Sequence, residues 1–174
     1  MKKLILPLFI LIGFGSFGQS QNCQIIGFAD TDYILQVLPE FNKAQNELQI
    51  DINQYEKQFE AKVAEYENKL RMYQQGASAM IDIVRLDKEN ELRRIQESIE
   101  KFQGDVQVAI RKRENELIQP ILSKVGRAID AVAQENGFDL ILNSKVGATR
   151  VVQFADKKFD VSLLVLDKLG VDKD

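Results

Sequence analysis

The chain has 174 residues and a formal net charge of −3, with three prolines, one cysteine, and neither histidine nor tryptophan. Without histidine there is no imidazole metal ligand, no Ser–His or Cys–His nucleophile pair and no general base that titrates near pH 7. A single cysteine excludes a disulfide within the chain and a cysteine-based zinc site. The composition therefore argues against an enzyme, and we expect no catalytic residue, no metal site and no cofactor.

The N-terminus has the three parts of a secretory signal peptide. Two lysines are followed by an apolar stretch over residues 4–14 and then by small residues that end at Gly18. The stretch is shorter than the roughly 18 residues that a membrane-spanning helix needs. We expect residues 1–18 to be cleaved on export, with an uncleaved anchor as the alternative. Cys23 then either pairs between chains or stays a free thiol in an N-terminal tail.

A strand and a short helix are predicted next. The compact apolar run over residues 25–29 indicates a strand. Asp30 or Thr31 can cap a helical turn over 32–38, because its side-chain oxygen accepts hydrogen bonds from free amide groups. Pro39 ends this turn and suits the first position of a new helix, where no amide hydrogen is required.

Residues 41–74 predict one long helix, since they contain neither glycine nor proline and their apolar residues recur at helical spacing. The pattern repeats every eleven residues, about 3.67 per turn, which predicts a straight or slightly right-handed rod. A helix with a single apolar stripe needs a partner to be stable in water. The stripe comprises Phe41, Ala44, Leu48, Ile52, Tyr55, Phe59, Val63, Tyr66 and Leu70.

The partner helix is predicted to follow directly after a turn. Beyond Gly76, apolar residues keep alternating steps of three and four from Leu92 to Val106. Arms over 41–74 and 82–118 would measure about 51 and 55 Å at 1.5 Å per residue. Near-equal lengths across a short turn indicate an antiparallel helical hairpin over 41–118, with its tip near 74–82.

The remaining chain predicts helix, two strands and a last helix. Pro120 should kink or restart the second arm, because its ring displaces the carbonyl four residues earlier. The helix beyond it should stop at Gly137. Residues 138–142 and 151–155 read as two strands around a glycine-containing turn. Asp160 can cap the last helix.

The fold predicted is mostly α with a small β body, in which the long hairpin arm is inserted into an α+β domain. This body, 22–40 plus 119–173, has about 74 residues, which is marginal for one chain. Its short apolar strands would also expose edges that invite pairing with another chain. We therefore predict a homo-oligomer, with Pro39 and Pro120 as the hinge between body and arm. The candidate oligomer residues are Ile26, Phe28, Leu140, Leu142, Val151 and Phe154.

The tip of the hairpin is the best candidate for a surface that binds other proteins. It gathers apolar side chains within thirteen residues, more than two arms alone can bury. The unbranched methionine thioether adapts to varied partners. Alternatively, these residues only close the tip or touch a neighbouring arm. They are Met72, Tyr73, Met80, Ile81, Ile83 and Val84.

Aromatic residues of the first arm form a second candidate surface. Tyr55, Phe59 and Tyr66 could offer stacking and apolar contacts to an extended chain. They also occupy stripe positions, so that a role as the core of the hairpin is the alternative reading.

The chain resembles the Skp (OmpH) family of periplasmic chaperones over nearly its whole mature length. The matching stretches lie in order at 26–30, 117–121, 133–139, 154–156 and 159–161. The resemblance implies a trimer with a β-rich body and three helical arms around a cavity. In that cavity unfolded outer-membrane proteins are held without ATP, and the absence of a GxxxxGK phosphate loop agrees with this.

The charge balance differs from that of the best-known members of this family, which are strongly basic. This chain has a sequence pI near 5.2. Basic clusters at 93–94 and 111–113 are surrounded by glutamates. We therefore expect no nucleic acid partner, and the net negative charge argues against direct binding to lipid or lipopolysaccharide.

Two functions remain in competition at this stage. The first is an ATP-independent periplasmic holdase that binds unfolded outer-membrane (β-barrel) proteins between the arms of an oligomer. The alternative is an exported coiled-coil structural or adaptor protein with one specific folded partner, whose arms bury their apolar stripes.

Overall fold

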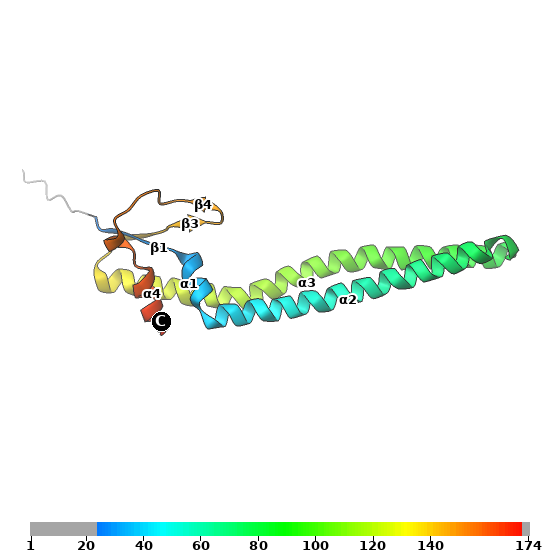
Figure 1. Cartoon of the computed structure of the whole chain (residues 1–174), viewed down its shortest axis with the longest axis horizontal. Coiled ribbons are helices and arrows are strands. Elements are labelled where there is room, and N and C mark those ends of the chain that lie inside the picture. Colours follow the sequence, from blue (N-terminus) through cyan, green and yellow to red (C-terminus); the bar gives the residue numbers. More distant parts are fainter. Residues whose placement is uncertain (1–23, 172–174) are drawn as a thin grey trace, which may run out of the picture.

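Two long helices run side by side from a small body and meet at a distant tip in the computed structural model of the chain (Figure 1). The structure describes residues 24–171. The predicted signal peptide, residues 1–18, and Cys23 lie outside the described residues. Within the described part no helix is long and apolar enough to cross a membrane.

The first elements begin where the sequence predicts them. Strand β1 (Ile26–Ala29) leads into helix α1 (Thr31–Val37), and the Asp30 carboxylate accepts a 3.1 Å hydrogen bond from the Tyr33 amide at its N-terminus. Helix α2 (Pro39–Gly76) has its proline at the first helical position. The predictions that Asp30 caps one helix and that Pro39 opens the next are both confirmed.

The hairpin is closed by one short turn. Helix α2 has 38 residues, and a single 3₁₀ turn, η1 (Ala77–Ala79), joins it to helix α3 (Asp82–Asn136), which has 55 residues. Helix α3 therefore runs beyond the arm and enters the body, where Gly137 ends it with a left-handed φ of 70°. The predicted fold class, mostly helical with a long antiparallel hairpin and a small strand body, is confirmed.

Of the kink or restart expected at Pro120, the restart is wrong, because α3 is one helix that includes this residue, and the kink stays a prediction. Proline removes one backbone hydrogen bond, which costs about 3 kcal/mol in a helix interior. Here Pro120 and Glu116, whose carbonyl loses its donor, both lie on the exposed side, where water can replace the bond. On the opposite side Ile121 and Val125 are buried in the body core. Tertiary packing therefore keeps the helix continuous.

The body contains two small sheets. β1 pairs in parallel with β2 (Leu140–Asn143), and β3 (Lys145–Val146) forms an antiparallel hairpin with β4 (Thr149–Arg150). Gly147 supplies the positive φ of 60° that the tight turn between β3 and β4 requires.

The strand predicted over 151–155 is absent, and this prediction is wrong for the single chain. The Val151 amide donates to the Ser144 carbonyl at 2.9 Å, which continues the β3–β4 register by one residue, but the Val152 amide donates to the same carbonyl at 3.2 Å, so that the ladder ends there. A run of β-branched and aromatic residues becomes a strand only beside a partner strand. Within this chain none of the described strands continues the β3–β4 ladder along 151–155.

The core lies where α1, the last part of α3 and the C-terminal helix α4 (Ser162–Lys168) meet beneath β1. A 3₁₀ turn, η2 (Lys157–Phe159), precedes α4. Ile34, Val125 and Val165 are almost completely buried there. The strand β1 reaches this core closely because it carries Gly27, against which the Phe138 ring packs. Both ends of the chain and the root of the arm thus share one core.

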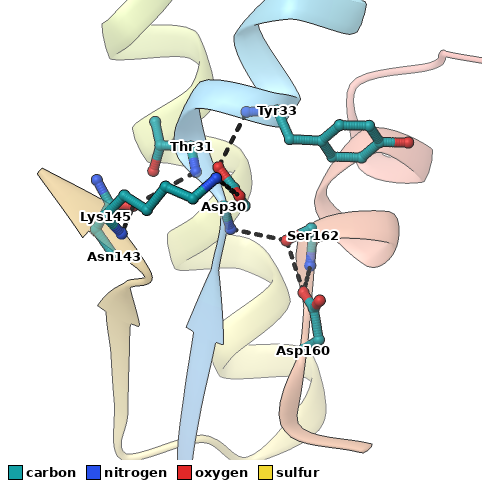
Figure 2. A network of polar contacts seen from close by, with 7 residues as sticks. All are labelled: Asp30, Thr31, Tyr33, Asn143, Lys145, Asp160 and Ser162. Atoms are coloured by element: carbon teal, nitrogen blue, oxygen red, sulfur yellow. Dashed lines mark hydrogen bonds and ion pairs between the residues drawn. The ribbon is translucent and has the colours of Figure 1, made fainter. Parts of the chain in front are cut away.

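A polar network fixes the root of the arm above this core (Figure 2). Lys145 Nζ donates to the Asp30 carboxylate at 2.8 Å, and the Asp30 amide donates to Ser162 Oγ at 2.8 Å. The Ser162 hydroxyl in turn donates to Asp160 Oδ1 at 2.6 Å. Asp160, which is predicted to cap the last helix, lies two residues before Ser162, the first residue of α4. Its Oδ1 accepts a hydrogen bond from the Ser162 amide at 2.9 Å. The network joins β1, α1, β3 and α4.

Replacing Gly27 by alanine should lower the free energy of unfolding by about 1–3 kcal/mol. An added Cβ would lie 3.0 Å from the Phe138 ring and 3.3 Å from the Phe159 carbonyl oxygen. The latter is a backbone atom, which cannot move away without a cost in free energy. Urea denaturation measures the effect. The control is Gly104→Ala in the middle of α3, where a Cβ meets nothing within 4 Å. This control should leave stability equal or raise it by up to about 1 kcal/mol. Equal stability of Gly27→Ala and wild type would contradict the packing.

The Asp30 carboxylate should make stability depend on pH in acid. The hydrogen bond from Lys145 is the main cause that lowers the pKa of Asp30 below its ordinary value of 3.8. A lowered pKa in the folded state means that the stabilisation is complete above the unfolded value and is lost as the pH falls through the folded one. Asn also caps helices, so Asp30→Asn removes the charge but keeps the cap. The substitution should lower the free energy of unfolding by on the order of 1 kcal/mol at neutral pH.

Urea denaturation of wild type and Asp30→Asn from pH 7 to pH 2 measures this effect. The stability difference should be constant at neutral pH and shrink below the ordinary pKa of 3.8. Lys145→Gln is the matched variant, since it removes the main cause of the shift and should reduce the pH-dependent part. A difference that grows in acid would refute the assignment.

Candidate functional site

The tip of the hairpin exposes a cluster of large apolar side chains. Ile81, Ile83 and Met72 are the most open, with 67%, 68% and 62% of their surface exposed. Leu86, 52% exposed, was not among the predicted residues, although its place three residues after Ile83 puts it on the same helical face. We call the following set the tip surface: Met72, Tyr73, Met80, Ile81, Ile83, Val84 and Leu86.

The turn itself is shaped by a methionine packed on a glycine. A Cβ added at Gly76 would lie 2.9 Å from the Met80 Cε, which shows that the end of the methionine side chain folds back over this glycine at the end of α2. The Met80 amide donates to the Ala77 carbonyl at 3.3 Å. Ile81, at the N-cap of α3, offers no side-chain acceptor to the first amides of the helix. An apolar residue thus occupies a position where polar caps are usual.

A polar clamp holds the two helices together directly behind the tip surface. The Lys69 ammonium binds the Glu91 carboxylate across the hairpin, and Lys88 binds the same carboxylate at 2.9 Å. These hydrogen bonds, that from Lys69 first, lower the pKa of Glu91 to about 2. The Tyr73 hydroxyl donates to Glu89 at 2.5 Å, a bond that raises the pKa of Tyr73. The clamp keeps the arms paired while the apolar cap stays open.

Two hollows lie at the tip surface. One, of about 220 Å³, lies between the helices. Its lining residues are Lys69, Met72, Tyr73, Met80, Lys88, Glu91 and Leu92. The other, of about 400 Å³, lies along the first turns of α3. Its lining residues are Ile83, Val84, Leu86, Asp87 and Asn90.

The middle of the arm is a half-closed seam. Tyr55 and Phe59 face Phe102 across a groove of about 370 Å³ between α2 and α3. These side chains and Tyr66 are half-buried. The Lys62 ammonium lies 5.4 Å from the centre of the Phe102 ring. Tyr55 and Phe59 therefore belong to the seam of the hairpin, although the groove leaves part of each ring reachable.

A second apolar surface covers one face of the body sheet. The register pairs Ile26 with Leu140 and Phe28 with Leu142, and alternation along the strands puts all four on the same face. Three of them are exposed, Leu140 by 48% and Ile26 by 44%, whereas Gly27 and Ala29 on the other face are buried. We call these four residues the outer sheet face.

The other two candidate oligomer residues lie in the irregular segment after β4. Val151 is 49% exposed and Phe154 is 92% exposed. Phe154 nevertheless lines the same groove of about 390 Å³ as Phe28, so the chain brings it next to the outer sheet face. Among residues 24–171, five of these six side chains are exposed and Phe28 is half-buried.

The geometry is typical of proteins that bind other proteins through exposed apolar surfaces. Apolar residues cap a long arm, and a second apolar face lies on the body to which the arm is attached. Residues 24–171 hold no cluster of three or more side chains suited to binding a metal ion. The arrangement offers contact area and ion pairs.

This chain belongs to the OmpH-like family of outer membrane proteins, whose sequence model matches residues 25–169. The resemblance found in the sequence is therefore confirmed. Among solved structures, the fold is similar to that of a proposed outer membrane chaperone (OmpH-like) from Caulobacter crescentus CB15. The two share 11% identity and a TM-score of 0.70 over 84% of this chain and 83% of that one. No curated protein matches the chain at a significant level.

Proposed function

We propose that this protein is an ATP-independent periplasmic holdase that binds unfolded outer-membrane (β-barrel) proteins and prevents their aggregation. The observation that carries the proposal is the tip surface, because a cluster of exposed large apolar side chains, among them Met72, Ile81 and Ile83, marks a surface that contacts other molecules. Membership of the OmpH-like family supports an outer-membrane client. The signal-peptide pattern at residues 1–18 supports export to the periplasm.

The chemistry of the tip surface suits clients of varied sequence. Its aliphatic and thioether side chains make non-directional contacts, and unbranched methionines can repack against different partners. The tip surface lies on two helix ends joined by one turn, and the clamp of Lys69, Lys88 and Glu91 keeps it from collapsing inward. Binding of this kind needs no chemical step, which agrees with the lack of a phosphate loop in the sequence.

A homo-oligomer would cover the outer sheet face and place several arms around one space. A body whose sheet has two strands per chain gains a sufficient core when copies join their sheets. Resemblance to the family supports three copies. Several tip surfaces binding one unfolded chain would add avidity without any new contact. In this arrangement the segments around Pro39 and Pro120 set the angle at which the arm leaves the body.

The net charge argues for protein clients over lipid. With three more acidic than basic groups, the chain lacks the positive field that draws proteins to anionic membranes or nucleic acid. Within the arms, six basic residues form ion pairs with carboxylates, as in the pairs Lys101–Asp105 and Arg113–Asp51. The arm faces are therefore well solvated and close to neutral.

The double variant Met80→Asp with Ile81→Asp should lose client binding but keep its helices. The charges oppose apolar contact and should lower client affinity by about tenfold. Asp at the N-cap of α3 can accept a hydrogen bond from the first helical amides, so the helix itself should not weaken. The measurement is light scattering of an unfolded β-barrel protein diluted into buffer with equimolar chaperone and no nucleotide.

Val108→Asp is the matched control, because Val108 is 61% exposed on α3 but lies far from the tip. It should suppress aggregation as well as the wild type does. Equal aggregation with and without wild-type protein would refute the holdase function. Co-purification of one defined folded partner would instead favour the structural or adaptor role.

The double variant Leu140→Asp with Leu142→Asp should dissociate the oligomer. Both side chains lie on the outer sheet face, where charges cannot be buried against a neighbouring copy. Native mass by sedimentation should be that of a trimer for wild type and of a monomer for the variant. The control is Leu163→Asp, because Leu163 lies on α4 and is 50% exposed. This variant should stay trimeric. A monomeric wild type would refute this part of the proposal.

A further inference from the structure

The oxidisable side chains of this protein are concentrated at the tip surface. The whole chain has one cysteine, three methionines, and neither tryptophan nor histidine. Met1 lies in the predicted signal peptide and Cys23 in the N-terminal segment. In residues 24–171, Met72 and Met80 are therefore the only sulfur-containing side chains. Since methionine thioethers are common targets of oxidants, chemical attack on the folded arm should fall on the tip.

The two methionines differ in access. Met72 is 62% exposed, whereas Met80 is half-buried with its Cε packed over Gly76. Both line the hollow of about 220 Å³ behind the tip surface, next to Tyr73. An oxidant in solution therefore reaches Met72 freely and reaches Met80 only when the side chain lifts off the glycine. Oxidation should proceed in that order.

We propose that Met72 and Met80 form an oxidation site that switches off client binding when a two-electron oxidant such as hydrogen peroxide is present. This inference rests on the proposed holdase function. A lone pair of the thioether sulfur attacks one peroxide oxygen, so that a sulfur–oxygen bond forms and the oxygen–oxygen bond breaks. The sulfur loses two electrons and becomes a sulfoxide. The released hydroxide takes the proton of the transferred hydroxyl group and leaves as water.

The hollow is suited to accept the oxidised form. A sulfoxide oxygen is a hydrogen-bond acceptor, and Lys69 and Lys88 line the same hollow as the two methionines, together with Glu91. Each ammonium has three donors. Lys88 uses one on Glu91 at 2.9 Å, and Lys69 also binds this carboxylate. The lysines beside the hollow can therefore offer a donor to a sulfoxide oxygen at the tip surface.

The consequence for client binding follows from the loss of apolar surface. Conversion of a flexible thioether into a polar sulfoxide disrupts methionine-rich interfaces. At Met72 it places a strong dipole among the exposed aliphatic side chains. At Met80 it opposes packing on Gly76 and therefore loosens the turn that presents Ile81 and Ile83. A methionine sulfoxide reductase, supplied with two electrons and two protons by a thiol, removes the oxygen as water and restores the thioether, so the change is a reversible switch.

The test uses the full mature oligomer carrying Cys23→Ser, so that no thiol reacts. Hydrogen peroxide treatment should add about 16 Da per sulfoxide, at Met72 before Met80 in peptide mass spectra. Suppression of aggregation of the unfolded β-barrel protein should then fall by at least about threefold in affinity and return after methionine sulfoxide reductase. Circular dichroism should show that the helices remain.

Two variants separate tip oxidation from damage elsewhere. Met72→Leu with Met80→Leu keeps the apolar volume but has no thioether to oxidise, so that peroxide should leave its client binding at the level measured before treatment. Met72→Gln with Met80→Gln imitates the polarity of the sulfoxides and should bind weakly without any oxidant. Full client binding by a wild type that carries both sulfoxides overturns the inference and leaves the holdase function intact. Equal loss in the leucine variant also overturns it. Failure of untreated wild type to suppress aggregation overturns the proposed function itself.

Discussion

The structure depends on the packing of the last part of α3 against α1 and α4. Val125 and Val132 of this helix are 1% and 2% exposed, and they meet Ile34 and Val165 from the two ends of the chain. This contact fixes the second arm inside the body, while Asp30 and its partners fix the start of the first. Because both helices of the hairpin are held in the body, the hairpin can project although its own apolar seam is only partly buried. The arm has few buried residues, Ala44 and Leu92 among them.

Along the arm, ion pairs join α2 and α3 where apolar packing between them is incomplete. Arg113 binds Asp51 at 2.9 Å near the root, and the clamp around Glu91 holds the other end. Between them the groove at Tyr55 and Phe59 stays partly open. Exposed pairs of this kind contribute little to stability each, but they set the register of the two helices. The tip surface can therefore remain apolar and accessible on an arm whose alignment is fixed elsewhere.

The proposed switch follows from the same division of labour. The side chains that give the tip its adaptability, Met72 and Met80, are also those that oxidants attack first. The clamp that holds the helices consists of lysines and glutamate, which hydrogen peroxide leaves unchanged. Oxidation can thus alter what the tip binds without opening the hairpin. At the end of the arm, the methionines therefore serve client binding, whereas the lysines and the glutamate of the clamp hold the two helices together.

The local pattern of the sequence was enough to predict the hairpin, the cap at Asp30, the helix start at Pro39 and the stop at Gly137, because each depends on neighbours within a few residues. The apolar cluster at the tip could be predicted for the same reason, and Leu86 was within reach of the same argument. Tertiary structure alone decided the rest. Packing of Ile121 and Val125 carried α3 through Pro120, where local chemistry favours a break. The absence of a neighbouring strand left 151–155 irregular despite its strand-forming residues, since a strand requires a partner that lies far away in sequence or in another chain.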